Sequence, residues 1–279
     1  MTIDEGAVAR HYGGAGLLAR IDAGLKAMGV DLDHLAIDDL APVDEFHVGG
    51  RKAADHALNA LAPQTGQHIL DVGCGIGSTA QLMASRYGCR VHGIDLTPEY
   101  IDIARTLTDR VGLGDNVDFD VASALAMPFE DATFHGAVTM HVAMNIADQE
   151  GLYGEIARVL KPGAAFCVYD VMKKDDQPLA YPVPWAETAE TAETSHLTTA
   201  DQTRALLEGA GFEVTLVDDR SDAAAAFFRK RLEAADEGPA PLGVYLLMGA
   251  TWRDKIKNNL ANTGNGRIGP VLMMARRRP

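Results

Sequence analysis

Apolar runs typical of β-strands alternate with helical patterns along most of this 279-residue chain. Strands and helices that alternate at this spacing form βαβ units, so the sequence predicts an α/β fold around a mostly parallel sheet. Seven strand-like runs lie at 68–72, 90–96, 116–122, 134–140, 164–172, 212–219 and 268–276. The helical patterns between them lie at 77–87, 98–112, 149–160, 199–210 and 222–235.

Two regions depart from this alternation. Residues 1–62 have helical patterns, and we expect them to form a cap over the ligand-binding edge of the sheet. Residues 173–198 are rich in prolines and small polar residues, and we interpret them as an insertion because regular alternation resumes after them. The predicted organisation is therefore a helical cap at 1–62 and a single domain at 63–279 that contains the insertion.

Composition excludes several classes of partner. The formal net charge is −14 and the basic residues form no stripe, which argues against a nucleic-acid partner. No apolar run reaches the ~18–20 residues of a membrane span, and the N-terminus lacks the pattern of a signal peptide. Cys74, Cys89 and Cys167 stand too far apart for a disulfide framework or a zinc site. We expect a cytoplasmic protein without a metal or membrane partner, and a homodimer is left open.

Three glycines at alternate positions, Gly73, Gly75 and Gly77, follow the first predicted strand. In an open parallel sheet, ligands bind outside the carboxyl ends of the strands. Glycine permits positive φ and lets a ligand approach bare backbone, and the following helix presents its N–H groups there. The sequence therefore predicts a ligand site at this loop.

Two acids narrow the identity of that ligand. Dinucleotide folds use the spacing G-x-G-x-x-G, so the alternate glycines disfavour a nucleotide-dependent oxidoreductase. Asp71, just before the glycines, would repel a pyrophosphate but suits an ammonium group. Asp95 ends the second strand, where a carboxylate can accept hydrogen bonds from both hydroxyls of a ribose. S-adenosylmethionine carries an ammonium, a carboxylate and a ribose, so this pattern favours it as the cofactor.

Four further motifs occur in order within residues 67–172: ILDVGCGIG, VHGIDLTPEYIDIAR, AMPFEDATFHGAV and ARVLKPGAAF. In these motifs and their order the chain resembles a known family, the class I S-adenosylmethionine-dependent methyltransferases that act on small molecules. This resemblance implies a Rossmann-like sheet of seven strands, of which the last, 268–276, is antiparallel.

The resemblance further implies contacts with the cofactor. The residues at the matching positions are Asp71, Gly73, Gly75, Asp95, Leu96, Ser123, Ala124, Leu125 and Met140. The first three would line the methionine part, Asp95 would hold the ribose, and the carbonyl of Met140 would accept from the ammonium. Many relatives carry an acid that accepts from the adenine amino group, where this chain has Ser123. A neutral hydroxyl forms a weaker hydrogen bond than a carboxylate, so we expect somewhat weaker cofactor binding.

The N-terminal segments ARHYGGAGLL and PVDEFHVGGRKAA resemble the cap of sarcosine and dimethylglycine N-methyltransferases. That resemblance implies closure over the cofactor by Tyr12 and residues 46–50, and an amine acceptor such as a glycine derivative. The alternative is an O-, C- or S-methyltransferase of a small metabolite. A second alternative is a protein that binds S-adenosylmethionine without catalysis.

Candidate residues for the acceptor side follow from the same segments. His141, after the fourth strand, is the candidate catalytic base, because its ordinary pKa of about 6.5 suits proton removal at neutral pH. An alcohol or phenol acceptor would need such a base, whereas a neutral amine would not. The candidate substrate-binding residues are Tyr12, His47, Asn145 and Trp185. Trp185 lies in the insertion, and its aromatic face would favour a cationic amine.

Overall fold

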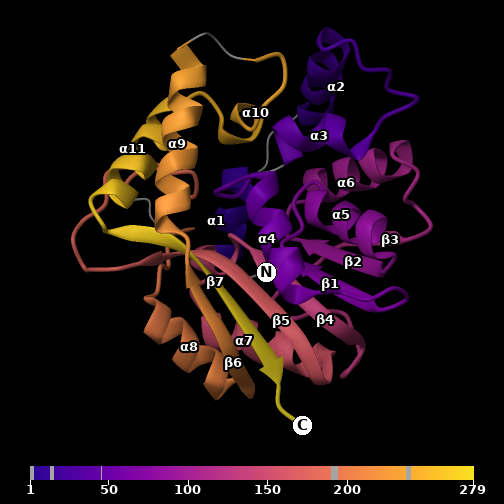
Figure 1. The fold of residues 1–279 in the computed structure, drawn as a ribbon, viewed down its shortest axis with the longest axis vertical. Helices are drawn as coiled ribbons and strands as arrows, with labels where there is room; N and C mark the ends of the chain where they lie inside the picture. The colour runs from indigo at the N-terminus through magenta and orange to yellow at the C-terminus, as the bar shows by residue number, and fades with distance from the viewer. Residues whose placement is uncertain (1–2, 13–15, 45, 190–193, 237–239) are drawn as a thin grey trace.

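The computed structural model describes residues 3–12, 16–44, 46–189, 194–236 and 240–279. Its centre is a seven-stranded sheet in the order β3-β2-β1-β4-β5-β7-β6 (Figure 1). The strands are β1 (His68–Val72), β2 (Arg90–Asp95), β3 (Val117–Val121), β4 (Phe134–Met140), β5 (Leu160–Lys173), β6 (Phe212–Asp219) and β7 (Ile268–Arg277). Neighbours among β1 to β5 pair in parallel, and β7 pairs antiparallel with both β5 and β6. The predicted fold class, including the antiparallel last strand, is confirmed.

Helices cover both faces of this sheet. The helices between the strands are α5 (Ser78–Tyr87), α6 (Pro98–Arg110), α7 (Gln149–Val159), α8 (Ala200–Gly209) and α9 (Ser221–Asp236). On one face, Leu82 of α5 and Ile101 of α6 share a buried cluster with strand residues such as Val91. On the other face, Tyr153 of α7 and Leu207 of α8 belong to the second sheet cluster. The apolar density of the strands is explained by this burial on both sides.

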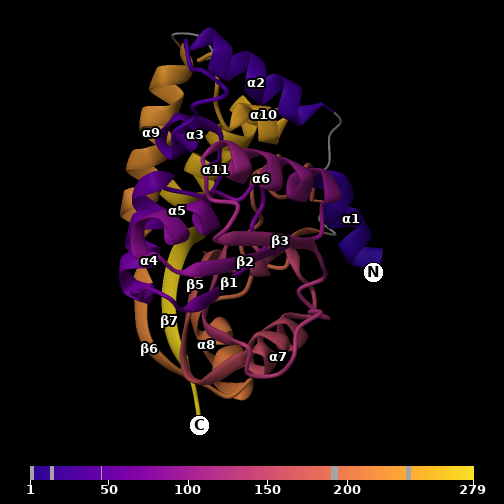
Figure 2. The same ribbon diagram turned by 90° about the vertical axis from the view of Figure 1, so that its right-hand side faces the viewer.

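The N-terminal region is helical, as expected. It contains α1 (Ile3–Tyr12), α2 (Leu17–Ala27), α3 (Ile37–Asp44) and α4 (Arg51–Leu61). The last of these packs directly on the sheet, because Leu58 and Leu61 are buried in the same cluster as Ile69 of β1. Ile21 of α2 and Leu40 of α3 instead belong to a separate cluster. These two helices lie above β2 and β3 in Figure 2. The domain boundary at residue 62 stays a prediction.

Two further helices, α10 (Tyr245–Met248) and α11 (Trp252–Gly264), lie between α9 and β7, where no helix was predicted. α11 packs against α9, and the two stand together above the sheet (Figure 1). The buried side of α11 is largely polar, with Lys255, Asn259, Asn262 and Thr263, so the segment lacks an apolar helical period. Apolar periodicity therefore does not reveal α11 in the sequence.

One strand boundary also differs. The sequence patterns predict a helix at 149–160 and a strand at 164–172, but β5 already begins at Leu160, which pairs with Phe134. The register then shifts before Ala165 pairs with Gly136, so the proline and glycine lie in an irregularity within the strand. None of the described helices combines the length and the apolar composition needed to cross a membrane.

Candidate active site

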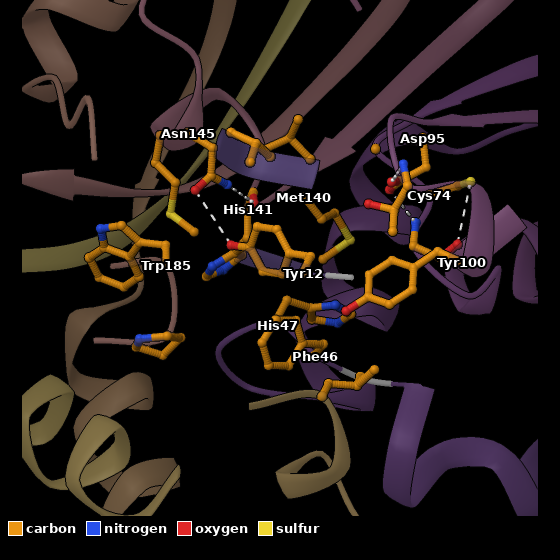
Figure 3. A pocket seen from close by; sticks show the side chains of 18 of the residues that line it. Tyr12, Phe46, His47, Cys74, Asp95, Tyr100, Met140, His141, Asn145 and Trp185 are labelled. Atoms are coloured by element: carbon orange, nitrogen blue, oxygen red, sulfur yellow. Dashed lines mark hydrogen bonds between the residues drawn. The ribbon is translucent and has the colours of Figure 1, made fainter. Parts of the chain in front are cut away.

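A pocket lies beyond the carboxyl ends of β1, β2 and β4 and brings together nearly all the residues predicted for the site. Those that line it are Tyr12, His47, Asp71, Gly73, Gly75, Asp95, Leu96, Ala124, Leu125, Met140, His141, Asn145 and Trp185. Figure 3 shows Asp95 on one side, Trp185 on the opposite side, and Tyr12, His141 and Asn145 between them. We call the side of Asp95 the polar end of the pocket.

The glycine loop forms the floor of the polar end. Gly73 and Gly75 have φ values of +74° and +56°, which L side chains rarely adopt. A Cβ atom on Gly73 would meet Cγ2 of Val142 at 2.3 Å, whereas a Cβ on Gly75 would meet no heavy atom within 4 Å. Position 73 therefore has no room for a side chain because Val142 fills the space. At position 75 the space is open and is part of the pocket.

Two carboxylates lie at this end, of which Asp71 is buried and Asp95 is half-buried. Oδ2 of Asp95 accepts from the N–H of Gly75 at 3.0 Å, and Oδ1 accepts from the N–H of Thr97 at 2.9 Å. Oδ2 of Asp71 is buried and has no hydrogen-bond partner among the described residues. Burial, and then the charge of Asp95, raise the pKa of Asp71 to about 7, and burial also raises the pKa of Asp95. Such a pair favours a cationic ligand that would hold both groups ionised.

Two hydroxyl groups at the polar end also have no internal partner. Ser78 Oγ and Tyr100 OH line the pocket, are buried, and have no hydrogen-bond partner among the described residues. Buried polar atoms are usually hydrogen-bonded, so a ligand with several polar groups would complete this site. The residues present therefore fit S-adenosylmethionine, which brings an ammonium, a carboxylate and ribose hydroxyls.

Ser123 is not among the described residues that line the pocket, but it connects to one that is. Its hydroxyl donates a hydrogen bond to the Glu5 carboxylate of α1 and accepts from the N–H of Leu125 at 3.0 Å. Glu5 is 8% exposed and lines the pocket. A carboxylate thus stands beside residues 122–125, where the family resemblance implied that an acid was missing. Sequence reasoning did not find Glu5, because nothing local marks a residue 118 positions away from Ser123.

His141 occupies the middle of the pocket, directly after β4, with a φ of +59°. Its backbone N–H donates to the carbonyl of Tyr169 at 2.8 Å, and its ring Nε2 accepts from the N–H of Val48 at 3.4 Å. Burial, and then the nearby His47, lower the pKa of His141 to about 3. The ring is therefore neutral with its proton on Nδ1, and it is a much weaker base than an ordinary histidine.

Tyr12, Asn145 and His47 join the cap to this central part. The hydroxyl of Tyr12 donates to Oδ1 of Asn145 at 3.4 Å, and Nδ2 of Asn145 donates to the carbonyl of His141 at 3.3 Å. Nε2 of His47 donates to the carbonyl of Gly50 at 3.2 Å. The two N-terminal segments singled out in the sequence therefore both reach the pocket.

The far side of the pocket is apolar. Trp185 is 1% exposed, and its indole N–H donates to Oγ of Ser195 at 3.0 Å. The residues of this part share one hydrophobic cluster and line the pocket, and we call it the distal chamber: Met144, Trp185, Phe227, Phe228, Met248 and Ile256. Of these, only Trp185 was predicted from the sequence. The others come from the turn after β4 and from α9 to α11.

Comparison with known proteins agrees with this geometry. The family described as "Methyltransferase domain" matches residues 70–168. An O-methyltransferase of Pyrenophora dematioidea is 31% identical over 173 residues, which cover 62% of this chain and 64% of that protein. The O-methyltransferase resE of Aspergillus sclerotiorum is 31% identical over 219 residues, covering 78% of this chain and 79% of that protein. The chain thus spans less than two thirds of the Pyrenophora relative but most of the Aspergillus one.

A solved structure shares the fold along the whole chain. It is a geranyl diphosphate C-methyltransferase from Streptomyces coelicolor A3(2) in complex with S-adenosyl-L-homocysteine, with a TM-score of 0.72. The sequences are 18% identical, and the match covers 99% of this chain and 98% of that one. The Aspergillus relative and the family match show that the chain belongs to the class I S-adenosylmethionine-dependent methyltransferases, and the solved structure shares the fold. The sarcosine and dimethylglycine branch is not established by them.

Proposed function

We propose that the protein transfers a methyl group from S-adenosylmethionine to a hydroxyl oxygen of a small, largely apolar molecule. The observation that carries the proposal is the division of one pocket into a polar end with two acids, Asp71 and Asp95, and an apolar distal chamber, with His141 and Asn145 between them. Relatives that are 31% identical and named as O-methyltransferases support oxygen as the acceptor atom.

The polar end binds the cofactor in this proposal. Asp71 pairs with the ammonium group, Asp95 accepts from the ribose hydroxyls, and Glu5 accepts from the adenine amino group. When bound, S-adenosylmethionine supplies an electrophilic methyl carbon, so that a C–O bond forms to the acceptor while the C–S bond breaks. Gly73 and Gly75 allow the backbone to lie close to the ligand, and Leu96, Ala124, Leu125 and Met140 complete the walls of this end.

The middle of the pocket positions the acceptor. The hydrogen bonds from Tyr12 to Asn145 and from Asn145 to the His141 carbonyl orient these side chains within the pocket. Positioning of this kind can supply up to ~7–11 kcal/mol of a displacement barrier. His141 as the base remains part of the proposal, but its pKa of about 3 makes His47 the alternative acceptor of the hydroxyl proton.

A glycine derivative, the amine first implied by the cap resemblance, fits this lining less well. Its carboxylate would need a cationic partner near the reacting nitrogen. Among the described residues that line the pocket, Arg231 is the only lysine or arginine, and it lies on α9. The apolar chamber therefore favours a larger apolar acceptor over a glycine derivative.

The test combines binding and turnover. Calorimetric titration with S-adenosylhomocysteine should give micromolar affinity, and Asp95→Ala should weaken it tenfold or more. A screen with S-adenosylmethionine should then find methylation of apolar phenols or enols but not of sarcosine. Turnover on sarcosine alone would restore the amine assignment. Tight binding without turnover on phenols, enols, amines or thioethers would favour a non-catalytic binding protein.

A further inference from the structure

Asn259 of α11 differs from the other buried polar residues of its helix. It is 1% exposed and lines the pocket, and its side-chain nitrogen Nδ2 is buried without a hydrogen-bond partner among the described residues. By contrast, Asn262 donates to the carbonyl of Ala180 at 2.9 Å and accepts from its N–H at 2.8 Å. Lys255 donates to the carbonyl of Met248 at 3.0 Å. Of these three residues, only Asn259 has a buried side-chain nitrogen without any hydrogen-bond partner among the described residues.

The position of Asn259 places its side chain beside the distal chamber. Ile256, one helical turn earlier on the same face of α11, belongs to the chamber, and residues three apart on a helix are neighbours on its surface. The other members of the chamber are apolar or aromatic. An amide N–H that faces such surroundings costs stability unless a partner arrives, because it has been removed from water without a replacement.

We propose that Asn259 determines substrate specificity by donating a hydrogen bond to an oxygen of the methyl acceptor, at a site remote from the reacting atom. This rests on the proposed function. The ligand chemistry follows from the donor: an amide N–H selects a carbonyl, ether or hydroxyl oxygen and offers nothing to an ammonium group. The substrate class is therefore a largely apolar molecule that carries, besides the hydroxyl to be methylated, a second oxygen on its apolar body.

A matched pair of probes tests this directly. 6-Acetyl-2-naphthol and 6-ethyl-2-naphthol have similar size and the same hydroxyl, and they differ in one carbonyl oxygen. Calorimetric titration of each into the complex with S-adenosylhomocysteine should show about 3- to 10-fold tighter binding of the acetyl compound, the range expected for one neutral hydrogen bond. Asn259→Leu, of similar volume but without the donor, should bind both probes equally and leave the affinity for S-adenosylhomocysteine unchanged.

The neighbouring Asn258 provides the control variant. Its Nδ2 donates to the carbonyl of Pro182 at 3.0 Å, and it is not among the residues that line the pocket. Asn258→Leu should keep the preference for the acetyl compound. A second readout needs no probe. Since Asn259→Leu removes an unsatisfied buried donor, the melting temperature of the ligand-free protein should stay the same or rise.

Three outcomes would overturn the assignment of Asn259: equal binding of the two probes by the unmodified protein, a preference that survives Asn259→Leu, or a clear fall in melting temperature for that variant. Binding of neither naphthol to a complex that does hold S-adenosylhomocysteine would overturn the apolar substrate class. Failure to bind S-adenosylhomocysteine at all would instead refute the proposed function, so the two failures are distinguishable.

Discussion

Gly73 and Gly75 are two residues apart and both have positive φ, yet alanine should mainly affect folding at Gly73 and cofactor binding at Gly75. At Gly73 the new Cβ meets Val142 at 2.3 Å, so the backbone penalty of roughly 1–2 kcal/mol is joined by an overpacking cost of roughly 1–3 kcal/mol. At Gly75 the Cβ meets nothing within 4 Å, so only the backbone penalty applies to folding. Gly73→Ala should therefore cost about 2–5 kcal/mol of unfolding free energy, and Gly75→Ala about 1–2 kcal/mol.

Cofactor binding should be weakened more by Gly75→Ala than by Gly73→Ala. The open space at Gly75 belongs to the polar end of the pocket, so its Cβ would intrude on the cofactor and weaken S-adenosylhomocysteine by tenfold or more, about 1.4 kcal/mol. Denaturant unfolding and calorimetric titration of the two variants measure both quantities. Wild-type affinity in Gly75→Ala would refute the idea that this glycine makes room for the cofactor.

A double-mutant cycle isolates the contact at Gly73. Val142→Ala removes the two methyl groups that the new Cβ would meet at 2.3 and 3.0 Å, while its own Cβ remains at 3.2 Å. The pair Gly73→Ala and Val142→Ala should therefore be less destabilised than the sum of the single variants, by about 1–3 kcal/mol. A coupling energy near zero would mean that backbone conformation alone explains the glycine.

Three further predictions concern the titrating groups of the pocket. Burial raises the pKa of Asp71 to about 7, and only its ionised form attracts the cofactor ammonium. Affinity for S-adenosylhomocysteine should therefore decline by up to about tenfold per pH unit below pH 7, and Asp71→Asn should remove this dependence in calorimetric titration. Glu5→Ala should abolish any preference for S-adenosylhomocysteine over its inosine analogue, which lacks the adenine amino group; a preference that persists would contradict the role of Glu5. Because the pKa of His141 is about 3, His141→Gln should leave the shape of the turnover profile between pH 6 and 8 unchanged. A limb in that range that disappears in His141→Gln would show that His141 titrates there after all.

The parts of the site that could be predicted from the sequence are those fixed by short-range geometry. Asp71 and the glycines lie in one turn after β1, and Asp95 ends the adjacent parallel strand. Once the strands are paired, the hydrogen bond from Gly75 to Asp95 follows from that register. A local motif therefore carries enough information to place the polar end of the pocket.

The parts that could not be predicted depend on contacts between distant segments. Glu5 reaches Ser123 across 118 residues, and its role becomes visible only when α1 is placed over the sheet. α11 was not predicted because its buried face contains Lys255, Asn259 and Asn262 in place of an apolar stripe. Both cases have one cause. The positions of these polar residues depend on tertiary contacts, and such contacts produce no apolar periodicity from which they could be predicted.

The polar end and the distal chamber of the pocket are built in different ways, and this difference affects how the methyl acceptor is selected. The polar end is built from loops between strands, so its geometry is tied to the hydrogen-bond ladder of the sheet. The distal chamber is built largely from side chains of α9 to α11 and the insertion, which contact the sheet through apolar packing. Packing tolerates exchanges of similar volume at a cost of less than about 1.5 kcal/mol, whereas the ladder does not tolerate a shift in register. Substitutions at Phe227, Met248 or Ile256 should therefore change which acceptor is bound while S-adenosylhomocysteine affinity stays within a few-fold, and a parallel loss of both would show that the two ends are not built independently.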